Sequence, residues 1–143
     1  MSQKPFKILG IEHIGIAVED LNGISDVFGD LLGLELRSRE KIDDQKVITD
    51  IYKTGSGKLE FLKATDKYSP IAKFIEKNGK GMHHIALKVD NLQASLDYLK
   101  EQGIQLIDTL PRIGAEGFKI AFIHPGSTGG VLIELCEKKE MLS

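Results

Sequence analysis

The chain contains one sequence pattern twice. "HIGIAVEDL" (13–21) aligns with "HIALKVDNL" (84–92) at an offset of 84 − 13 = 71 residues. In each segment a histidine opens an apolar stretch, a valine follows five residues later, and an acidic or amide pair precedes a leucine. "GLEL" (33–36) and "GIQL" (103–106) repeat the likeness at an offset of 103 − 33 = 70. A repeat of this length indicates a duplicated module, and this constrains the fold more than any other feature of the chain.

Both copies continue with apolar residues at the spacing of an amphipathic helix. These residues are Ile24, Val27, Phe28 and Leu31 in the first copy, and Leu92, Leu96 and Leu99 in the second. Asp20 and Asn91 precede the two runs, and Gly33 and Gly103 follow them. Glycine is the residue most often found at the left-handed end of a helix. We therefore predict one helix in each copy.

Three strands are predicted after each helix, from apolar runs bounded by turn residues. They cover residues 34–39, 46–53 and 58–64 in the first copy, and 104–109, 118–124 and 131–137 in the second. The glycine-rich turns "TGSG" (54–57) and "PGSTGG" (125–130) fit hairpin connections better than phosphate loops, because neither matches a nucleotide-binding fingerprint. Each copy is thus predicted to be a β-α-β-β-β module, which places the chain in the α+β class.

A short helix is predicted to link the two copies. In "SPIAKFIEKNG" (69–79), Ser69 can cap the helix, Pro70 suits its first turn, and Gly79 can end it. The 143 residues fit one domain made of two modules, about 9–64 and 82–137, joined by this linker.

Composition excludes some classes of function without choosing one. A net charge of −2 gives no electrostatic reason to expect nucleic acid or an anionic membrane as a partner. The sequence has no apolar run of membrane-spanning length, and we expect no secretory leader, because no charged-then-apolar segment precedes Phe6. The single cysteine, Cys136, excludes an internal disulfide, and we expect a reducing, cytoplasmic location and a packing role for this residue.

Two histidines and two glutamates occupy matching positions in the copies. Glu60 lies in the apolar run "KLEFL" and Glu134 in "VLIELCE", each in the last strand of its module. The separation from His13 to Glu60 is 60 − 13 = 47 residues, and from His84 to Glu134 it is 134 − 84 = 50. Two imidazoles and two carboxylates suit zinc, cobalt, nickel or manganese. We hypothesise one divalent metal ion held by His13, Glu60, His84 and Glu134.

Simpler interpretations exist for each residue taken singly. A histidine at the start of a strand is usually structural or exposed, and a glutamate in an apolar strand usually faces solvent. His83 and His84 are adjacent on a strand, so their side chains point to opposite faces of the sheet. We expect His84 to be the ligand, because it aligns with His13, and His83 to be structural.

The modules resemble the vicinal oxygen chelate superfamily, which includes glyoxalase I, extradiol dioxygenases and fosfomycin-resistance proteins. The segments "HIGIAVEDL", "SPIAKFIEKNGKGMHHIALKVDNL" and "PRIGAEGFKIAFIHPGSTGGVLIEL" resemble the methylmalonyl-CoA epimerase family within it, over about residues 9–137. The resemblance implies that the two modules pair into a curved, mixed sheet around a cleft. It also places His13, Glu60, His84 and Glu134 on the family's metal positions.

The resemblance further implies an activity. A metal-dependent enzyme of this family removes and returns the α-proton of an acyl-CoA substrate through an enolate, and Glu134 and Glu60 would carry the proton. Lys73 or Lys77 would contact the CoA nucleotide, and the protein would be a homodimer. A glyoxalase I-type lactoylglutathione lyase and a metal-free module that binds a small molecule are the alternatives.

The sequence departs from the family pattern at three places. Glu60 stands where the best-known pattern has glutamine, although glyoxalase I has glutamate there. Glu116 stands where the family usually has histidine. The family's second base is sought on the third strand of the first module, where the nearest match is Thr49, which cannot be a base, while the neighbouring Asp50 points to the other face. The second proton carrier is therefore open at the level of the sequence.

Overall fold

A computed structural model describes residues 3–139, which form two compact units. One unit contains residues 13–83, and the other combines the segment up to residue 12 with the chain from residue 84 onward. Strand β1 (Ile8–Val18) therefore contributes residues 8–12 to one unit and 13–18 to the other, and β5 (Gly81–Val89) is divided between His83 and His84.

The unit of residues 13–83 is a four-stranded sheet in the order β2-β3-β4-β1. Strands β2, β3 and β4 pair antiparallel, and β4 pairs parallel with β1. The elements besides β1 are α1 (Leu21–Ile24), a π-helical segment (Ser25–Leu31), β2 (Glu35–Ile42), a 3₁₀ turn (Asp43–Gln45), β3 (Val47–Lys53), β4 (Lys58–Ala64) and α2 (Pro70–Asn78).

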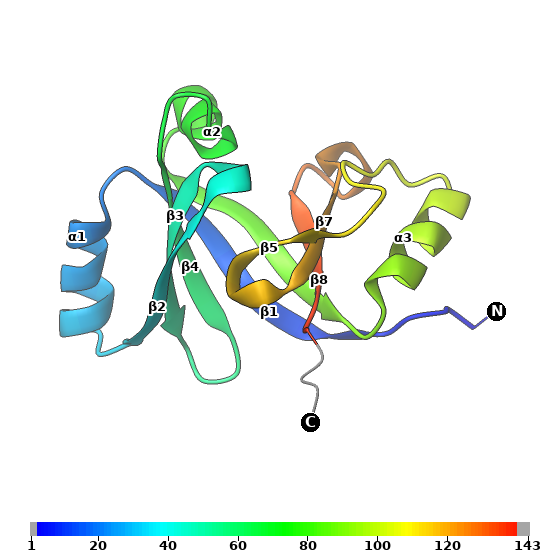
Figure 1. Ribbon diagram of the computed structural model, residues 1–143, viewed down its shortest axis with the longest axis horizontal. Helices are drawn as coiled ribbons and strands as arrows, with labels where there is room; N and C mark the ends of the chain where they lie inside the picture. The colour runs from blue at the N-terminus through cyan, green and yellow to red at the C-terminus, as the bar shows by residue number, and fades with distance from the viewer. Residues whose placement is uncertain (1–2, 140–143) are drawn as a thin grey trace. The chain divides into compact units, whose positions relative to one another are not determined.

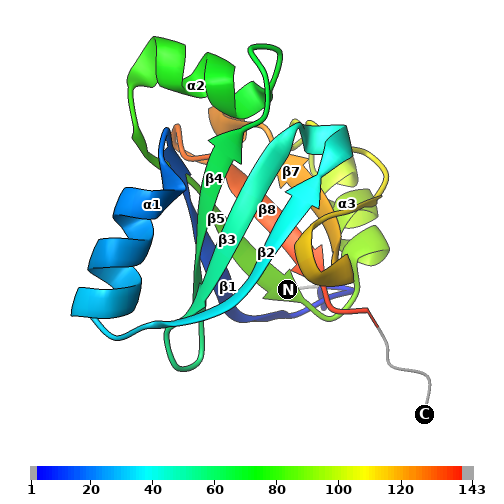
Figure 2. The same ribbon diagram turned by 60° about the vertical axis from the view of Figure 1, so that its left-hand side comes forward.

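The two helices of this unit pack on opposite faces of its sheet (Figures 1 and 2). Leu21 of α1 joins Tyr52 and Phe61 in a core on one face. Ile71 of α2 joins Leu62 on the other face, near the end of the strands. Helix α2 has the predicted caps, because Ser69 Oγ accepts the amide of Ile71 and the chain leaves the helix at Gly79 with φ of 81°. The part of the second face beyond α2 is where polar side chains gather.

The first predicted helix is present, but its longer, second part (Ser25–Leu31) has π-helical hydrogen bonding. The amide of Leu32 bonds the carbonyl of Val27, five residues earlier, rather than four. A wider turn shifts the phase of the following side chains, so positions at i and i+7 no longer share a face. Phe28 packs toward the core, while Leu31 is 80% exposed, so the prediction of one continuous apolar face was wrong.

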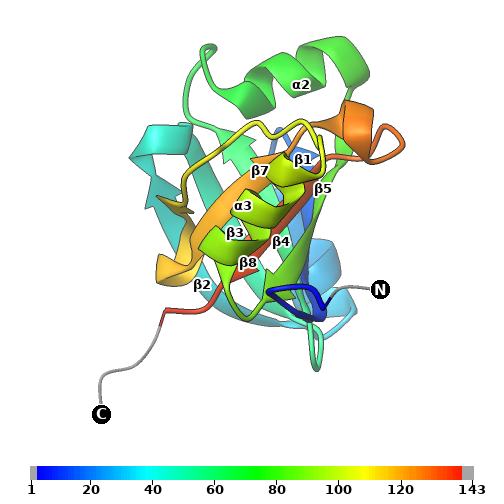
Figure 3. The same cartoon turned by 90° about the vertical axis from the view of Figure 1, so that its right-hand side faces the viewer.

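The second unit has strand order β5-β8-β7-β6, with β5 and β8 parallel and the other pairs antiparallel. Helix α3 covers one face of this sheet (Figure 3). Phe6 of the N-terminal segment packs against Tyr98 of this helix. Its elements besides β5 are α3 (Leu92–Glu101), β6 (Arg112–Ile113), β7 (Lys119–Ile123), β8 (Ile133–Glu137) and two 3₁₀ turns (Ala115–Gly117 and Pro125–Ser127).

The strand predicted at residues 104–109 is not regular, and the strand that the structure has instead is shorter and later. Leu106 makes one isolated bridge with Ile123, and β6 contains two residues. Asp108 explains the interruption, because its carboxylate, instead of a backbone carbonyl, accepts the amide of Phe122 at 2.9 Å. A side chain that replaces a ladder partner ends regular pairing at that point.

The predicted α+β class with two β-α-β-β-β modules is confirmed. Each module has its first strand parallel to its last, and one helix on one face. Within the described residues, no helix has the length and apolar character needed to span a membrane.

Candidate metal and catalytic site

His13 and Glu60 are brought together by the parallel pairing of β1 with β4. Gly15 lies opposite Glu60, so His13 is two residues earlier on the same face of the sheet. His13 Nδ1 lies 2.9 Å from Glu60 Oε2. Both residues are buried, with 6% and 4% of their surface exposed. The two side chains are therefore in contact within this unit.

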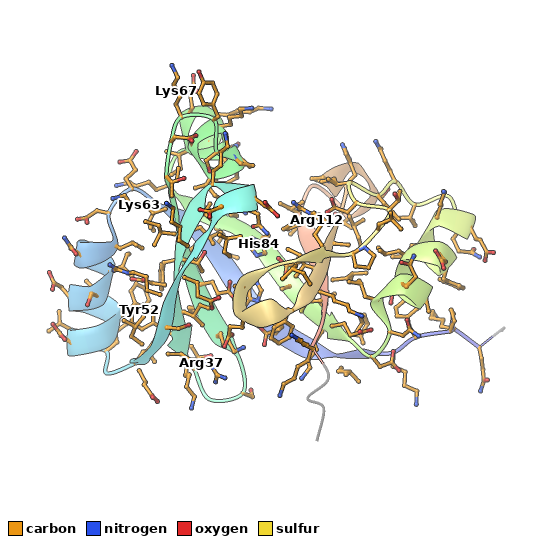
Figure 4. The ribbon with its side chains drawn as sticks, in the orientation of Figure 1. Arg37, Tyr52, Lys63, Lys67, His84 and Arg112 are labelled. Atoms are coloured by element: carbon orange, nitrogen blue, oxygen red, sulfur yellow. The ribbon has the colours of Figure 1, made fainter. Side chains whose placement is uncertain are left out.

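His84 and Glu134 meet in the other unit by the same register. Ala86 lies opposite Glu134 in the parallel pair of β5 with β8, and His84 is again two residues earlier. His84 Nε2 lies 3.4 Å from Glu134 Oε1, and the two residues are 5% and 4% exposed. The ring of Phe122 meets the ring of His84 edge to face at 5.6 Å. Figure 4 marks His84 among the side chains.

The shared register excludes the simpler interpretation of the glutamates. Neither Glu60 nor Glu134 faces bulk solvent, and a buried carboxylate needs a compensating partner. The partner of Glu60 is His13, two residues before Gly15, which lies opposite Glu60. The partner of Glu134 is His84, two residues before Ala86, which lies opposite Glu134. The repeat in the sequence is therefore a repeat of one local geometry.

The two pairs have the chemistry and spacing of metal ligands. Imidazole nitrogen and carboxylate oxygen are common ligands of zinc and of the neighbouring transition metals. Two ligand atoms that each lie about 2.1 Å from one ion are about 3.0 Å apart at a right angle and about 3.4 Å apart at the tetrahedral angle. The observed separations, 2.9 Å and 3.4 Å, match these values, so the residues of each pair fit a divalent ion.

A second carboxylate, Glu40, lies on the sheet face of His13 and Glu60. Glu40 was not predicted from the sequence as a site residue. Glu40 is opposite Thr49 in the β2–β3 ladder, and Thr49 is opposite Leu62 in the β3–β4 ladder, which places all three on the face of Glu60. Its side chain is half-buried, and its Oε2 accepts the Ser38 hydroxyl at 3.4 Å. The alternation of "RSREKI", with Ser38, Glu40 and Ile42 on one face, was the available signal.

The two residues considered on the third strand do not supply a base. The Thr49 hydroxyl is fully buried and has no hydrogen-bond partner within the described residues. Asp50 lies on the opposite face, as predicted, and is fully buried. Arg39 binds it through two hydrogen bonds, Nε to Oδ1 at 2.6 Å and Nη2 to Oδ2 at 2.9 Å. This contact raises the pKa of Arg39, and a carboxylate held in this way is a structural ion pair.

His83 and Cys136 have structural surroundings. The His83 ring packs edge to face on Phe74 at 4.9 Å, and burial lowers the pKa of His83 to about 4. Cys136 is buried in the core on the His84 side of its sheet, where Sγ lies 3.6 Å from the carbonyl oxygen of Leu87. Glu116, the residue that departs from the family pattern, lies in a tight turn with φ of 58°.

Comparison with known proteins identifies a family whose sequence pattern this chain matches. The sequence pattern of the Glyoxalase/Bleomycin resistance protein/Dioxygenase superfamily matches residues 12–122. The chain is 44% identical over 129 residues to the uncharacterized protein YqjC of Bacillus subtilis, covering 90% of this chain and 92% of that protein. It is 35% identical over 127 residues to the ethylmalonyl-CoA/methylmalonyl-CoA epimerase of Cereibacter sphaeroides, covering 87% and 95%.

The structure is also similar to solved structures. A variant of the Streptomyces coelicolor methylmalonyl-CoA epimerase, in complex with 2-nitronate-propionyl-CoA, superposes with a TM-score of 0.90. The sequence identity is 31%, and the match covers 96% of this chain and 99% of that chain. The similarity therefore extends over both units of the chain.

Proposed function

Because the chain belongs to the glyoxalase/bleomycin resistance protein/dioxygenase superfamily, we propose that it is an epimerase of methylmalonyl-CoA. The reaction interconverts the (2R) and (2S) forms by moving the α-proton between the two faces of the substrate. Relatives over most of the chain carry this activity in their names, and a similar solved structure holds an acyl-CoA ligand. The observation that carries the proposal is the pair of buried His–Glu contacts in one repeated register.

We further propose that His13, Glu60, His84 and Glu134 bind one divalent metal ion, with cobalt, zinc, nickel and manganese as candidates. A bound ion would supply Lewis acidity that makes the α C–H of the substrate more acidic. The residues of the chain would hold the substrate oxygens and the α-carbon in one orientation.

The carboxylates of the site are the proposed proton carriers. The α-proton leaves carbon as H⁺ and bonds to a carboxylate oxygen, while the C–H electron pair moves into the enolate of the substrate. A carboxylic acid then returns a proton to the other face, so the reaction needs two carriers. Glu134 and Glu60 remain the predicted pair. Glu40 is a further candidate, because it shares a face with Glu60 and is half-buried.

A glyoxalase I-type isomerase on a glutathione hemithioacetal is the second candidate. One residue favours it, since glyoxalase I has glutamate at the position of Glu60. A metal-free binding module is disfavoured, because four buried ligand-type side chains would be retained without an ion.

We propose that the protein acts as a homodimer in the cytoplasm, with Lys73 or Lys77 near the CoA nucleotide. The native metal is to be found by reconstitution with each candidate ion. The single cysteine supports a reducing compartment.

Deuterium exchange tests the function directly. The protein is loaded with each candidate metal and incubated with (2S)-methylmalonyl-CoA in D₂O, and the α-position is followed by NMR and by chiral analysis. We expect α-deuterium and loss of stereochemistry with at least one metal. No exchange with any of them would exclude the epimerase, and turnover of methylglyoxal with glutathione would instead support the second candidate.

A further inference from the structure

Arg112 lies on the face of its sheet that carries His84 and Glu134. Arg112 is opposite Ile120 in the β6–β7 ladder, Phe122 is two residues later on β7, and Phe122 is opposite Glu134 in the β7–β8 ladder. Paired residues and residues two apart share a face of a sheet, so these side chains point to the same side. Figure 4 marks Arg112 and His84.

The guanidinium of Arg112 contacts Asp108 along one edge and the Phe122 ring with its planar face. Asp108 lies 3.2 Å from Arg112 Nε through Oδ1 and accepts Nη2 at 3.4 Å through Oδ2. The carbon of the guanidinium stands 5.8 Å from the centre of the Phe122 ring, a cation–π contact. Asp108 also accepts the backbone amide of Phe122, so one carboxylate holds the guanidinium and the backbone that carries the ring.

The rest of the guanidinium is available to a ligand. The side chain is 42% exposed, and Nη1 makes no hydrogen bond to the part of the chain that the structure describes. Arginine presents five N–H donors in a planar fork that matches a carboxylate. An arginine whose one edge is fixed loses little conformational entropy when its other edge binds an anion.

We propose that Arg112 binds the free carboxylate of the substrate and so selects carboxylated acyl thioesters over plain ones. The inference rests on the proposed function. Phe122 links Arg112 to the His84–Glu134 pair, because its ring contacts both Arg112 and His84. A carboxylate bound by Arg112 would therefore lie on the same sheet face as the His84–Glu134 pair, with the Phe122 ring in contact with both. Methylmalonyl and ethylmalonyl thioesters differ in their alkyl group and share the carboxylate that Arg112 would recognise.

Paired ligands separate this inference from the proposed function. The affinities of malonyl-CoA and propionyl-CoA, which differ by the carboxylate, are measured by calorimetry for the metal-loaded protein and for Arg112→Gln. Exchange of methylmalonyl-CoA in D₂O is measured in parallel. Arg37→Gln is the matched control, because Arg37 is an exposed arginine of the other unit and its loss changes the net charge equally.

We expect Arg112→Gln to weaken malonyl-CoA binding by about 10- to 100-fold, the usual effect of losing a hydrogen-bonded charge. Propionyl-CoA binding should change by less than about threefold, and Arg37→Gln should leave both affinities unchanged. Arg112→Lys keeps the charge without the fork and should recover part of the preference. It also serves as the second variant if Arg112→Gln melts at a lower temperature than the wild type.

The possible results distinguish failure of the proposed role of Arg112 from failure of the proposed epimerase function. An unchanged malonyl-to-propionyl affinity ratio in both Arg112 variants would overturn the role of Arg112, even if wild-type exchange is normal. Absence of exchange in the wild type, with the ratio lost in Arg112→Gln, would overturn the epimerase and keep Arg112 as a carboxylate-binding residue. Equal affinity of the wild type for both ligands would also overturn the proposal.

Discussion

The edge strands of the two units carry opposite charges on the face that bears the histidine and the glutamate. In the unit of residues 13–83, the edge strand β2 has eight residues and presents Glu40. In the other unit, the edge strand β6 has two residues and presents Arg112. The inner strands β1, β4, β5 and β8 keep the His–Glu register unchanged.

This comparison indicates how the edge strands of two duplicated modules can take different roles while the inner strands keep the same one. The inner strands are held by neighbours on both sides, so a change there would disturb both the core and the ligands. An edge strand has one neighbour and tolerates shortening and new charges. In our interpretation the repeated inner positions hold the proposed metal ion, while the edge strands differ and provide an acidic side for proton transfer and a basic side for the substrate carboxylate.

The largest expected effect comes from the inner strands. Glu134→Ala should lower α-proton exchange by about 10³-fold or more, because it removes a proposed ligand and a proposed proton carrier together. The measurement is deuterium incorporation in D₂O, with the melting temperature as the control for folding. Exchange near the wild-type rate would refute the role of Glu134.

The adjacent histidines give the next test. His84→Ala should lose most of the bound metal after dialysis, because the nitrogen beside Glu134 is removed. His83→Ala is the matched control and should keep the metal, because His83 packs on Phe74. Elemental analysis of both variants measures the difference. Equal metal content in the two proteins would contradict the assignment of His84.

Glu40→Gln tests the edge strand at nearly constant side-chain volume. We expect the metal content to stay at the wild-type level and exchange to fall by about 100-fold, the usual contribution of a general base. Glu35→Gln, an exposed position on the same strand, should leave both quantities unchanged. Loss of metal in Glu40→Gln would mean that Glu40 is a ligand, which would end the distinction between inner and edge positions.

The smallest expected effect concerns stability in acid. The folded protein holds the pKa of His83 at about 4, against 6.5 as its ordinary value, so the unfolded chain binds more protons between these pH values. The contribution of the neutral His83 ring to the free energy of unfolding is fully present above pH 6.5 and is lost as the pH drops toward 4. His83→Phe should reduce the acid-induced decrease in the free energy of unfolding by about 1–2 kcal/mol, measured by urea unfolding at several pH values. An equal pH dependence in both proteins would contradict the assignment.

Most of the local structure followed from the sequence because its signals are short-range. The caps of α3 and α2, at Asn91 and Ser69, are made by side chains on neighbouring amides. The His13–Glu60 and His84–Glu134 contacts form because the repeat preserves one strand register. The strand expected at 104–109 failed because Asp108 bonds a backbone amide 14 residues away, and no local pattern contains such a contact.

The sequence by itself determined the duplicated β-α-β-β-β order, the family, and the four ligand-type residues, because repetition and periodicity are properties of the chain. Only the tertiary structure decided that Glu40 shares a face with Glu60 and Arg112 a face with Glu134, because these relations pass through two or three strand ladders. It also decided that Asp50 is buried and bound by Arg39, a contact that the sequence pattern did not indicate. Pairing across strands joins residues far apart in the chain, and its result is visible only when the strands are in place.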